Sequence, residues 1–142
     1  MPDWRPRRGC PRPLTPRWRL PTVGRVKARF VGFGEIEIDG RRYARDVVVE
    51  RGRVSRRHKG PSKARRDEFG HTPLTLEESI PWRCRRLIVG TGADGGLPIV
   101  PEIRDEARRR DVELIAVPTD EACRLLAAAD PEETAAILHV TC

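Results

Sequence analysis

Residues 86–140 read RLIVGTGADGGLPIVPEIRDEARRRDVELIAVPTDEACRLLAAADPEETAAILHV, in which short apolar runs alternate with amphipathic stretches. The apolar runs predict strands at 86–89, 112–117 and 135–140, and the stretches between them predict helices at 101–110 and 119–129. Strand–helix–strand units of this length pair their strands in parallel, with right-handed crossovers. The segment therefore predicts a layered α/β fold.

Upstream of this unit, the chain shows the two-residue alternation of antiparallel strands. Apolar and charged side chains alternate within 25–30 and again within 35–38. Asp39-Gly40 is a strong signal for a tight hairpin turn, and 43–49 predicts a third strand. We therefore expect a β-meander attached to the α/β unit.

Residues 55–73 carry many charges and almost no apolar side chain. Such a segment is typical of a surface loop or a mobile flap, and we expect it to lie outside the core. It is followed by Thr75 and, three residues later, by Glu78. This is the spacing of a capping box, which predicts a short helix that Pro81 ends.

The composition suits one soluble domain, because the chain has 142 residues of which 38% are hydrophobic. No apolar run approaches the roughly 18 residues of a membrane-spanning helix. The net charge of +7 is unevenly spread: residues 1–66 carry 20 Lys/Arg and 6 Asp/Glu, and residues 67–142 carry 8 and 15. A solvated, arginine-rich surface is the simpler interpretation, since few aromatic side chains are available to stack on bases. Nucleic-acid binding through 56–66 is the less favoured alternative.

Residues 1–24 are rich in Pro and Arg, and six prolines between Pro2 and Pro21 are incompatible with an amphipathic helix. We expect a disordered basic tail there, or a start assigned too far upstream, with the folded domain at 25–142. The four cysteines form no Cys-x-x-Cys pair, and no secretory signal precedes them. Reduced thiols and a cytoplasmic location are therefore expected.

The turn Gly90-Thr91-Gly92-Ala93-Asp94-Gly95 matches the dinucleotide-binding pattern G-x-G-x-x-G after a strand. A true fingerprint begins its helix at the third glycine, so that the amides meet the pyrophosphate. Here Pro98 and Pro101 delay the helix, and the next predicted strand ends without an acidic residue for a ribose. A turn with a close backbone approach explains the glycines equally well. We therefore expect no cofactor.

The turn Gly90-Thr91-Gly92 and the ending Leu138-His139-Val140-Thr141-Cys142 are the most specific parts of a wider pattern. The other parts, in order along the chain, are Phe33-Gly34-Glu35-Ile36, Asp39-Gly40, Tyr43, Asp46-Val47-Val48, Leu97-Pro98, Glu113-Leu114-Ile115 and Pro118-Thr119. Together they resemble the Mth938-domain family (DUF498), at similar spacing from about residue 25 to residue 142.

The resemblance implies a three-layer α/β fold, with a mixed central sheet flanked by helices and an N-terminal meander. It implies no established catalytic activity, and the family includes the mitochondrial respiratory complex I assembly factor 3. Our leading hypothesis is therefore a non-enzymatic interaction protein of the assembly-factor type. Its protein partners are unidentified, and a homodimer is left open.

A second hypothesis is a domain that binds a small anionic ligand, or an enzyme, with its pocket at the glycine turn. Open α/β sheets bind ligands at the carboxyl ends of their parallel strands, and amides of a glycine turn can hold an anion. The candidate ligand-binding residues are Asp46, His71, Gly90, Thr91, Gly92 and Thr119. Two of them have simpler alternatives: Thr119 as a helix cap, and Asp46 as an edge residue facing water.

No catalytic residue and no metal site are predicted. His58, His71 and Cys84 lie thirteen residues apart, without the close ligand pair that metal sites usually have. His139 and Cys142 are expected on opposite faces of a strand, so they are not expected to form a Cys–His pair. We expect His139 to pack, or to make one hydrogen bond, at the end of the sheet.

Overall fold

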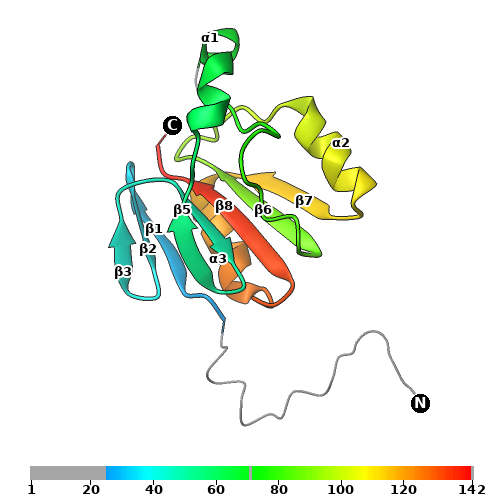
Figure 1. Ribbon diagram of the computed structural model, residues 1–142. Helices are drawn as coiled ribbons and strands as arrows, with labels where there is room; N and C mark the ends of the chain where they lie inside the picture. The colour runs from blue at the N-terminus through cyan, green and yellow to red at the C-terminus, as the bar shows by residue number, and fades with distance from the viewer. Residues whose placement is uncertain (1–24, 71, 142) are drawn as a thin grey trace, which may run out of the picture.

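The computed structural model describes residues 25–70 and 72–141. Its elements are β1 (Ala28–Gly32), β2 (Glu35–Ile38), β3 (Arg41–Tyr43), β4 (Val47–Glu50), β5 (Arg53–Arg56), the 3-10 helix η2 (Gly60–Arg65), α1 (Arg66–Phe69), β6 (Arg86–Thr91), α2 (Pro101–Arg109), β7 (Glu113–Val117), α3 (Thr119–Ala128) and β8 (Thr134–His139) (Figure 1). The tail predicted at 1–24, and His71 and Cys142, lie outside the described residues.

The strands form two open sheets. The smaller is the antiparallel meander β1-β2-β3, and the larger has the strand order β5-β4-β8-β6-β7 (Figure 1). In the larger sheet β6 runs parallel to both β7 and β8, whereas β4 runs antiparallel to β5 and β8. The expected α/β class, the mixed central sheet and the N-terminal meander are therefore confirmed.

Two apolar clusters cover the two faces of the five-stranded sheet and make three layers. On one face α3 and the meander pack on it, through a cluster that includes Ile36, Ile88, Leu126 and Leu138. On the other face lie α2 and the connection that precedes it, through Leu74, Leu87, Ile103, Ile137 and their neighbours. The central strands β6 and β8 are buried almost throughout, as their continuous apolar runs require.

The Asp39-Gly40 turn joins β2 to β3 as the sequence predicts. Both residues have positive φ, 52° and 85°, which is the conformation of a type I′ hairpin turn. The predicted third strand at 43–49 is wrong in its extent, because β3 ends at Tyr43 and β4 begins at Val47 in the other sheet. Between them the chain crosses from one sheet to the other, and Asp46 is held there by hydrogen bonds to Arg57 and Val140.

The charged segment 55–73 is more ordered and more buried than predicted. It contains the end of β5, η2 and α1, and Arg57 and Ser62 within it are 4% and 0% exposed. The capping-box helix at 75–78 does not form. Instead Thr75 and Glu78 turn their buried side chains toward Ser62 and Arg57, because hydrogen bonds to these groups replace the capping bonds.

The helices after β6 agree with their predicted ranges. Pro101 stands in the first turn of α2, where a missing N–H costs nothing, and Ile103 and Ala107 form its buried face. In the part of the chain that the structure describes, no helix is long and apolar enough to cross a lipid bilayer.

Candidate functional site

One end of the large sheet carries four polar side chains in a row across neighbouring strands, and we call it the polar row: Arg57, Asp46, His139 and Thr91. Val47 pairs with Arg56 on β5 and with Leu138 on β8, so the next residues, Asp46, Arg57 and His139, lie side by side. On the far side of His139 its partner is Thr91 of β6. This is the edge where the parallel strands β6 and β8 have their carboxyl ends, the usual location of ligand sites in open α/β sheets.

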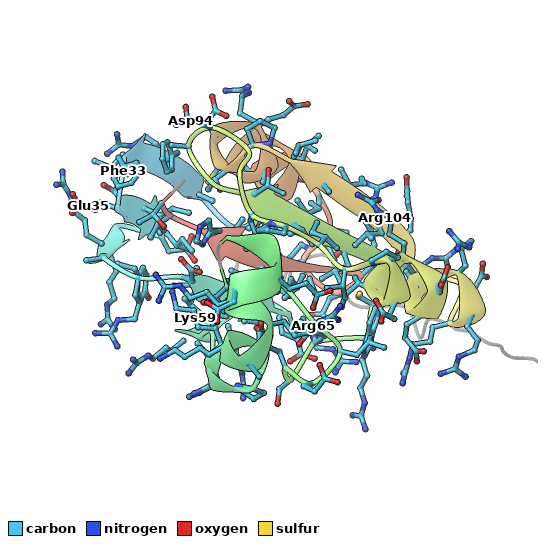
Figure 2. The ribbon with its side chains drawn as sticks, turned by 90° about the horizontal axis from the view of Figure 1, so that it is seen from above. Phe33, Glu35, Lys59, Arg65, Asp94 and Arg104 are labelled. Carbon is cyan, nitrogen blue, oxygen red and sulfur yellow. The ribbon has the colours of Figure 1, made fainter. Side chains whose placement is uncertain are left out.

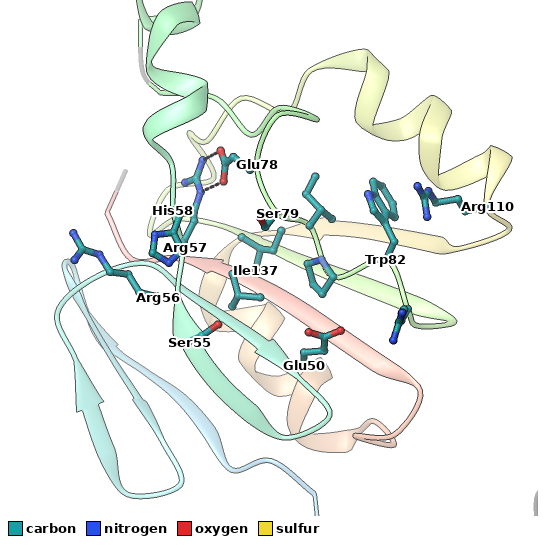
Figure 3. A pocket seen from close by; sticks show the side chains of 14 residues that line it. Glu50, Ser55, Arg56, Arg57, His58, Glu78, Ser79, Trp82, Arg110 and Ile137 are labelled. Carbon is teal, nitrogen blue, oxygen red and sulfur yellow. Dashed lines mark hydrogen bonds and ion pairs between the residues drawn. The ribbon is translucent and has the colours of Figure 1, made fainter.

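Arg57 is the centre of a buried ion-pair network. Its guanidinium donates two hydrogen bonds of 2.8 Å to the Glu78 carboxylate, one of 2.8 Å to Asp46 Oδ2 and one of 3.1 Å to the carbonyl oxygen of Pro73. The bidentate pair with Glu78 is drawn in Figure 3. One cation therefore connects β4, β5 and the segment that follows α1, and no charge in the network is left without a partner.

Asp46 also binds the end of β8. Its Oδ1 accepts the backbone N–H of Val140 at 3.0 Å, and its Oδ2 lies 2.7 Å from His139 Nδ1. Burial alone would raise the pKa of the Asp46 carboxyl, but the hydrogen bond and charge of His139, the Val140 amide and the charge of Arg57 lower it to about 2. Asp46 is therefore an ionised carboxylate, and the alternative of an edge residue facing water is wrong.

Two hydroxyls extend the network at its ends. Ser62 Oγ lies 2.7 Å from Thr75 Oγ1 and donates to Glu78 Oε2 at 2.5 Å. At the other end, His139 Nε2 lies 3.2 Å from Thr141 Oγ1. A continuous line of hydrogen bonds thus runs from η2 through the sheet edge to the last described residue.

A cavity of about 590 Å³ opens beside this row, and we call it the basic cavity. Its lining consists of Ala44, Arg45, Asp46, Arg56, Arg57, His58, Lys59, Gly60, Pro61, Lys63, Val140 and Thr141. Within residues 25–70 and 72–141, the side chains of Arg45, Arg56, Lys59 and Lys63 form no hydrogen bond or ion pair. Arg57 is paired with the carboxylates of Asp46 and Glu78, so these four groups are the unpaired cations of the lining.

The two sides of η2 differ in how their charges are paired. Figure 2 shows Lys59 on the side that faces the meander and Arg65 on the other side. Arg65 forms ion pairs with Glu68 at 3.0 Å and with Glu102 at 3.7 Å. Residues 56–66 therefore present paired charges on the side toward α2 and unpaired positive charges on the side toward the basic cavity.

The predicted glycine-turn site is built differently from the prediction. Gly92 N donates to Thr119 Oγ1 at 2.8 Å, Thr119 N donates to Gly92 O at 3.0 Å, and Thr119 Oγ1 donates to the His139 carbonyl at 2.5 Å. Two amides that were expected to hold an anion are thus already paired within the chain. The cap alternative for Thr119 is also wrong: Pro118 is the N-cap of α3, with no side-chain capping bond.

Gly90 has a packing reason to be glycine. A Cβ built on it would lie 2.8 Å from Thr119 Oγ1 and 3.1 Å from Leu138 Cδ2. The start of α3 therefore approaches β6 closely, which is the alternative that the sequence left open for these glycines.

Five of the six predicted site residues lie at or next to the polar row, and His71 lies outside the described residues. Asp46 lines the basic cavity, whereas Gly90, Thr91, Gly92 and Thr119 pack behind the end of β8. Sequence reasoning missed Arg57, Thr141 and the pairing of His139 with Asp46. The two-residue spacing of His139 and Thr141 was a usable signal, because side chains two apart on a strand share a face.

A second hollow, of about 420 Å³, lies on the other side of Arg57, and we call it the tryptophan groove (Figure 3). Ile80, Pro81 and Trp82 form one wall, and Val48 and Ile137 of the sheet lie on its floor. The guanidinium of Arg110 stands 5.4 Å from the centre of the Trp82 ring, within range of a cation–π contact.

The two described cysteines offer no reactive thiol. Burial raises the pKa of the Cys84 thiol, and burial and the charge of Asp120 raise that of Cys123 to about 12. Thiols with raised pKa values are poor nucleophiles. Among the described residues, no three His, Cys, Asp or Glu side chains are grouped so that they could hold a metal ion.

Comparisons with known proteins identify relatives of this chain. A family model described as "Protein of unknown function (DUF498/DUF598)" matches residues 29–139. A conserved hypothetical protein from Pyrococcus horikoshii OT3 is 33% identical, with a TM-score of 0.67 over 82% of this chain and 99% of that one. A structure named MT938 is 26% identical, with a TM-score of 0.58 over 82% of this chain and 99% of that one.

More distant likeness is limited to the fold. An outer membrane protein from Bartonella henselae is 17% identical, with a TM-score of 0.54 over 84% of this chain and 98% of that one. No curated protein matches the chain.

Proposed function

This chain belongs to the DUF498/DUF598 family, the Mth938-domain family that its sequence resembles, and we propose that it binds a small anionic ligand in the basic cavity. The observation that carries the proposal is the set of four cations, Arg45, Arg56, Lys59 and Lys63, that line this cavity without a partner among the described residues. Like charges gathered around one hollow repel each other, and a bound anion relieves that repulsion.

The size of the cavity favours a small molecule over a macromolecule. Sites for small ligands typically enclose about 300–1,000 Å³, with a few polar groups that fix the orientation, and the basic cavity holds about 590 Å³. Guanidinium and ammonium groups suit phosphate and carboxylate oxygens. A metabolite with one or two such groups therefore fits better than an extended nucleic acid.

The test is calorimetric titration of the full chain with inorganic phosphate and with pyrophosphate. The chain has three lysines, and two of them line the cavity, so Lys27→Gln is a matched control for Lys59→Gln/Lys63→Gln. The double variant should weaken binding at least tenfold, since a hydrogen bond to a charged group contributes about 1.5–3 kcal/mol. Lys27→Gln should bind as the native chain does. Absence of binding to the native chain would overturn the proposal.

Two measurements distinguish nucleic-acid binding through 56–66 from this proposal: the salt dependence of binding, and competition between an oligonucleotide and pyrophosphate. Binding to phosphates along a nucleic acid weakens steeply as salt rises. An oligonucleotide that binds more tightly than pyrophosphate, and that pyrophosphate does not displace, would favour the nucleic-acid alternative instead.

A role as an interaction or assembly protein is the second candidate, and the tryptophan groove supports it. Its apolar wall of Ile80, Pro81 and Trp82 would accept apolar side chains of a protein partner, including a second copy of this chain. Sedimentation of the native chain and of Trp82→Ala tests the homodimer. A dimer that persists in Trp82→Ala would exclude the groove as its interface. The cytoplasmic location stays a prediction from the sequence.

A further inference from the structure

His139 and Thr141 extend the hydrogen-bond network beyond the ion pairs of Arg57. They lie two residues apart at the end of β8, with His139 Nε2 3.2 Å from Thr141 Oγ1 and His139 Nδ1 2.7 Å from Asp46 Oδ2. A hydroxyl, an imidazole and a carboxylate in this order, at these distances, are the geometry by which an enzyme activates a hydroxyl nucleophile.

The hydrogen bonds around Asp46 favour one neutral tautomer of His139. Asp46 accepts hydrogen bonds from the Val140 amide and from Arg57, so it is held as a carboxylate and cannot donate to the imidazole. The proton between Asp46 and His139 therefore belongs to Nδ1. In the neutral tautomer that carries its proton on Nδ1, Nε2 presents its lone pair to the Thr141 hydroxyl.

The position of the three groups relative to the basic cavity is the second observation. Thr141 lines the cavity, whereas His139 is 6% exposed and is absent from the lining. Thr141 is thus at the cavity wall, and the imidazole of His139 lies behind it, sheltered from solvent. The unpaired cations of the same cavity could stabilise negative charge that develops on a bound substrate.

We propose that Thr141 is a nucleophile, with His139 as its general base and Asp46 as the residue that positions His139, and that it acts on an acyl ester or thioester that carries an anionic group. The anionic group of the substrate rests on the proposed function. The reactivity of Thr141 toward an electrophile does not.

The reaction is hydrolysis in two steps, and its atoms balance without oxidation or reduction. In the first step Thr141 Oγ bonds to the carbonyl carbon, its proton passes to His139 Nε2, and the bond to the leaving oxygen or sulfur breaks. His139 then protonates the leaving alcohol or thiol. In the second step a water oxygen bonds to the acyl carbon, its proton passes through His139 to Thr141 Oγ, and the free acid leaves.

Covalent labelling of the full chain with a fluorophosphonate tests the nucleophile directly. The expected adduct joins Thr141 Oγ to phosphorus with loss of fluoride, and peptide mapping by mass spectrometry locates it. Thr141→Val removes the hydroxyl and keeps the shape, so labelling should fall by a factor of about a hundred or more. Thr141→Ser should keep the label, and Thr72→Val is the matched control with the same chemical change outside the cavity.

Each outcome decides the inference. A Thr141 adduct that is lost in Thr141→Val and retained in Thr141→Ser and Thr72→Val supports it, provided that the variants melt near the native temperature. No adduct on the native chain, or equal labelling of Thr141→Val, would overturn it.

The labelling experiment tests the nucleophile and the calorimetric titration tests the anion site, so each can give a negative result without the other. Phosphate that binds to a chain that is never labelled would leave the binding proposal standing and overturn the nucleophile. A labelled Thr141 in a chain that binds no phosphate or pyrophosphate would support the nucleophile and overturn the anion site.

Discussion

Arg57 Nη1 and Asp46 Oδ2 lie 2.8 Å apart, and their side chains are 1% and 7% exposed. The pair joins the ends of two neighbouring strands at the one edge of the sheet where the parallel strands also end. The same carboxylate oxygen lies 2.7 Å from His139 Nδ1, so the ion pair and the histidine share one acceptor. Stability and the proposed chemistry thus depend on the same few atoms.

Arg57→Met is expected to destabilise the chain by about 3–5 kcal/mol, because removing one partner of a buried ion pair leaves the others uncompensated. Asp46 and Glu78 would both lose their cation. Urea unfolding monitored by circular dichroism measures the loss. The control is Arg29→Met, which removes an exposed pair with Glu37 and should cost no more than about 1 kcal/mol. Equal losses in the two variants would contradict the network.

Arg57→Lys is expected to recover only part of the stability. An ammonium group has three donors on a single nitrogen, so it cannot reproduce both the planar bidentate pair of the guanidinium with Glu78 and its bonds to Asp46 and Pro73. The unfolding free energy should therefore fall between those of the native chain and Arg57→Met. Full recovery by lysine would show that the charge alone is needed.

Acid should remove the contribution of Asp46. Its pKa is about 2 in the folded chain and 3.8 in an unperturbed carboxyl, so the folded state binds this proton more weakly. The stabilisation, about 2 kcal/mol, is complete above about pH 5 and is lost as the pH falls toward 2. Unfolding of the native chain and of Asp46→Asn between pH 5 and pH 2 measures it. A stability difference that does not shrink in acid would contradict this assignment.

Gly90→Ala is expected to destabilise the chain by about 1–3 kcal/mol, as overpacking in a tight core does. The new methyl group would meet Thr119 and Leu138, whose positions are fixed by hydrogen bonds and by the sheet. Gly32→Ala is the matched control, since nothing lies within 4 Å of its added Cβ. Thermal melting of both variants checks the difference, and a Gly90→Ala chain as stable as Gly32→Ala would argue against the close approach of α3.

The regular elements could be predicted because their signals are local. The apolar runs of β6, β7 and β8 and the amphipathic faces of α2 and α3 lie in continuous stretches of sequence, and the Asp39-Gly40 turn has its own signature. Most of the predicted element boundaries lie within two residues of the observed ones. The strand expected at 43–49 failed because apolar alternation does not show that the chain changes sheet after Tyr43.

The site was harder because its contacts depend on register. Arg57 lies in a run of charges that is typical of a solvated surface, and its partners Asp46 and Glu78 are distant in sequence. Thr75 and Glu78 have capping-box spacing, but tertiary bonds to Ser62 and Arg57 use their side chains instead. Only His139 and Thr141 carried a local signal, since alternate residues of a strand share a face.

The most direct test of the central proposal is to map backbone amide shifts by NMR while pyrophosphate is added to the full chain. The proposal predicts saturable shifts concentrated in residues 44–46, 56–61, 63 and 140–141, which line the basic cavity, with smaller shifts in Lys59→Gln/Lys63→Gln. Saturable shifts centred on 90–95 and Thr119 instead would restore the glycine-turn site predicted from the sequence. No saturable shift at any amide would contradict anion binding by this chain.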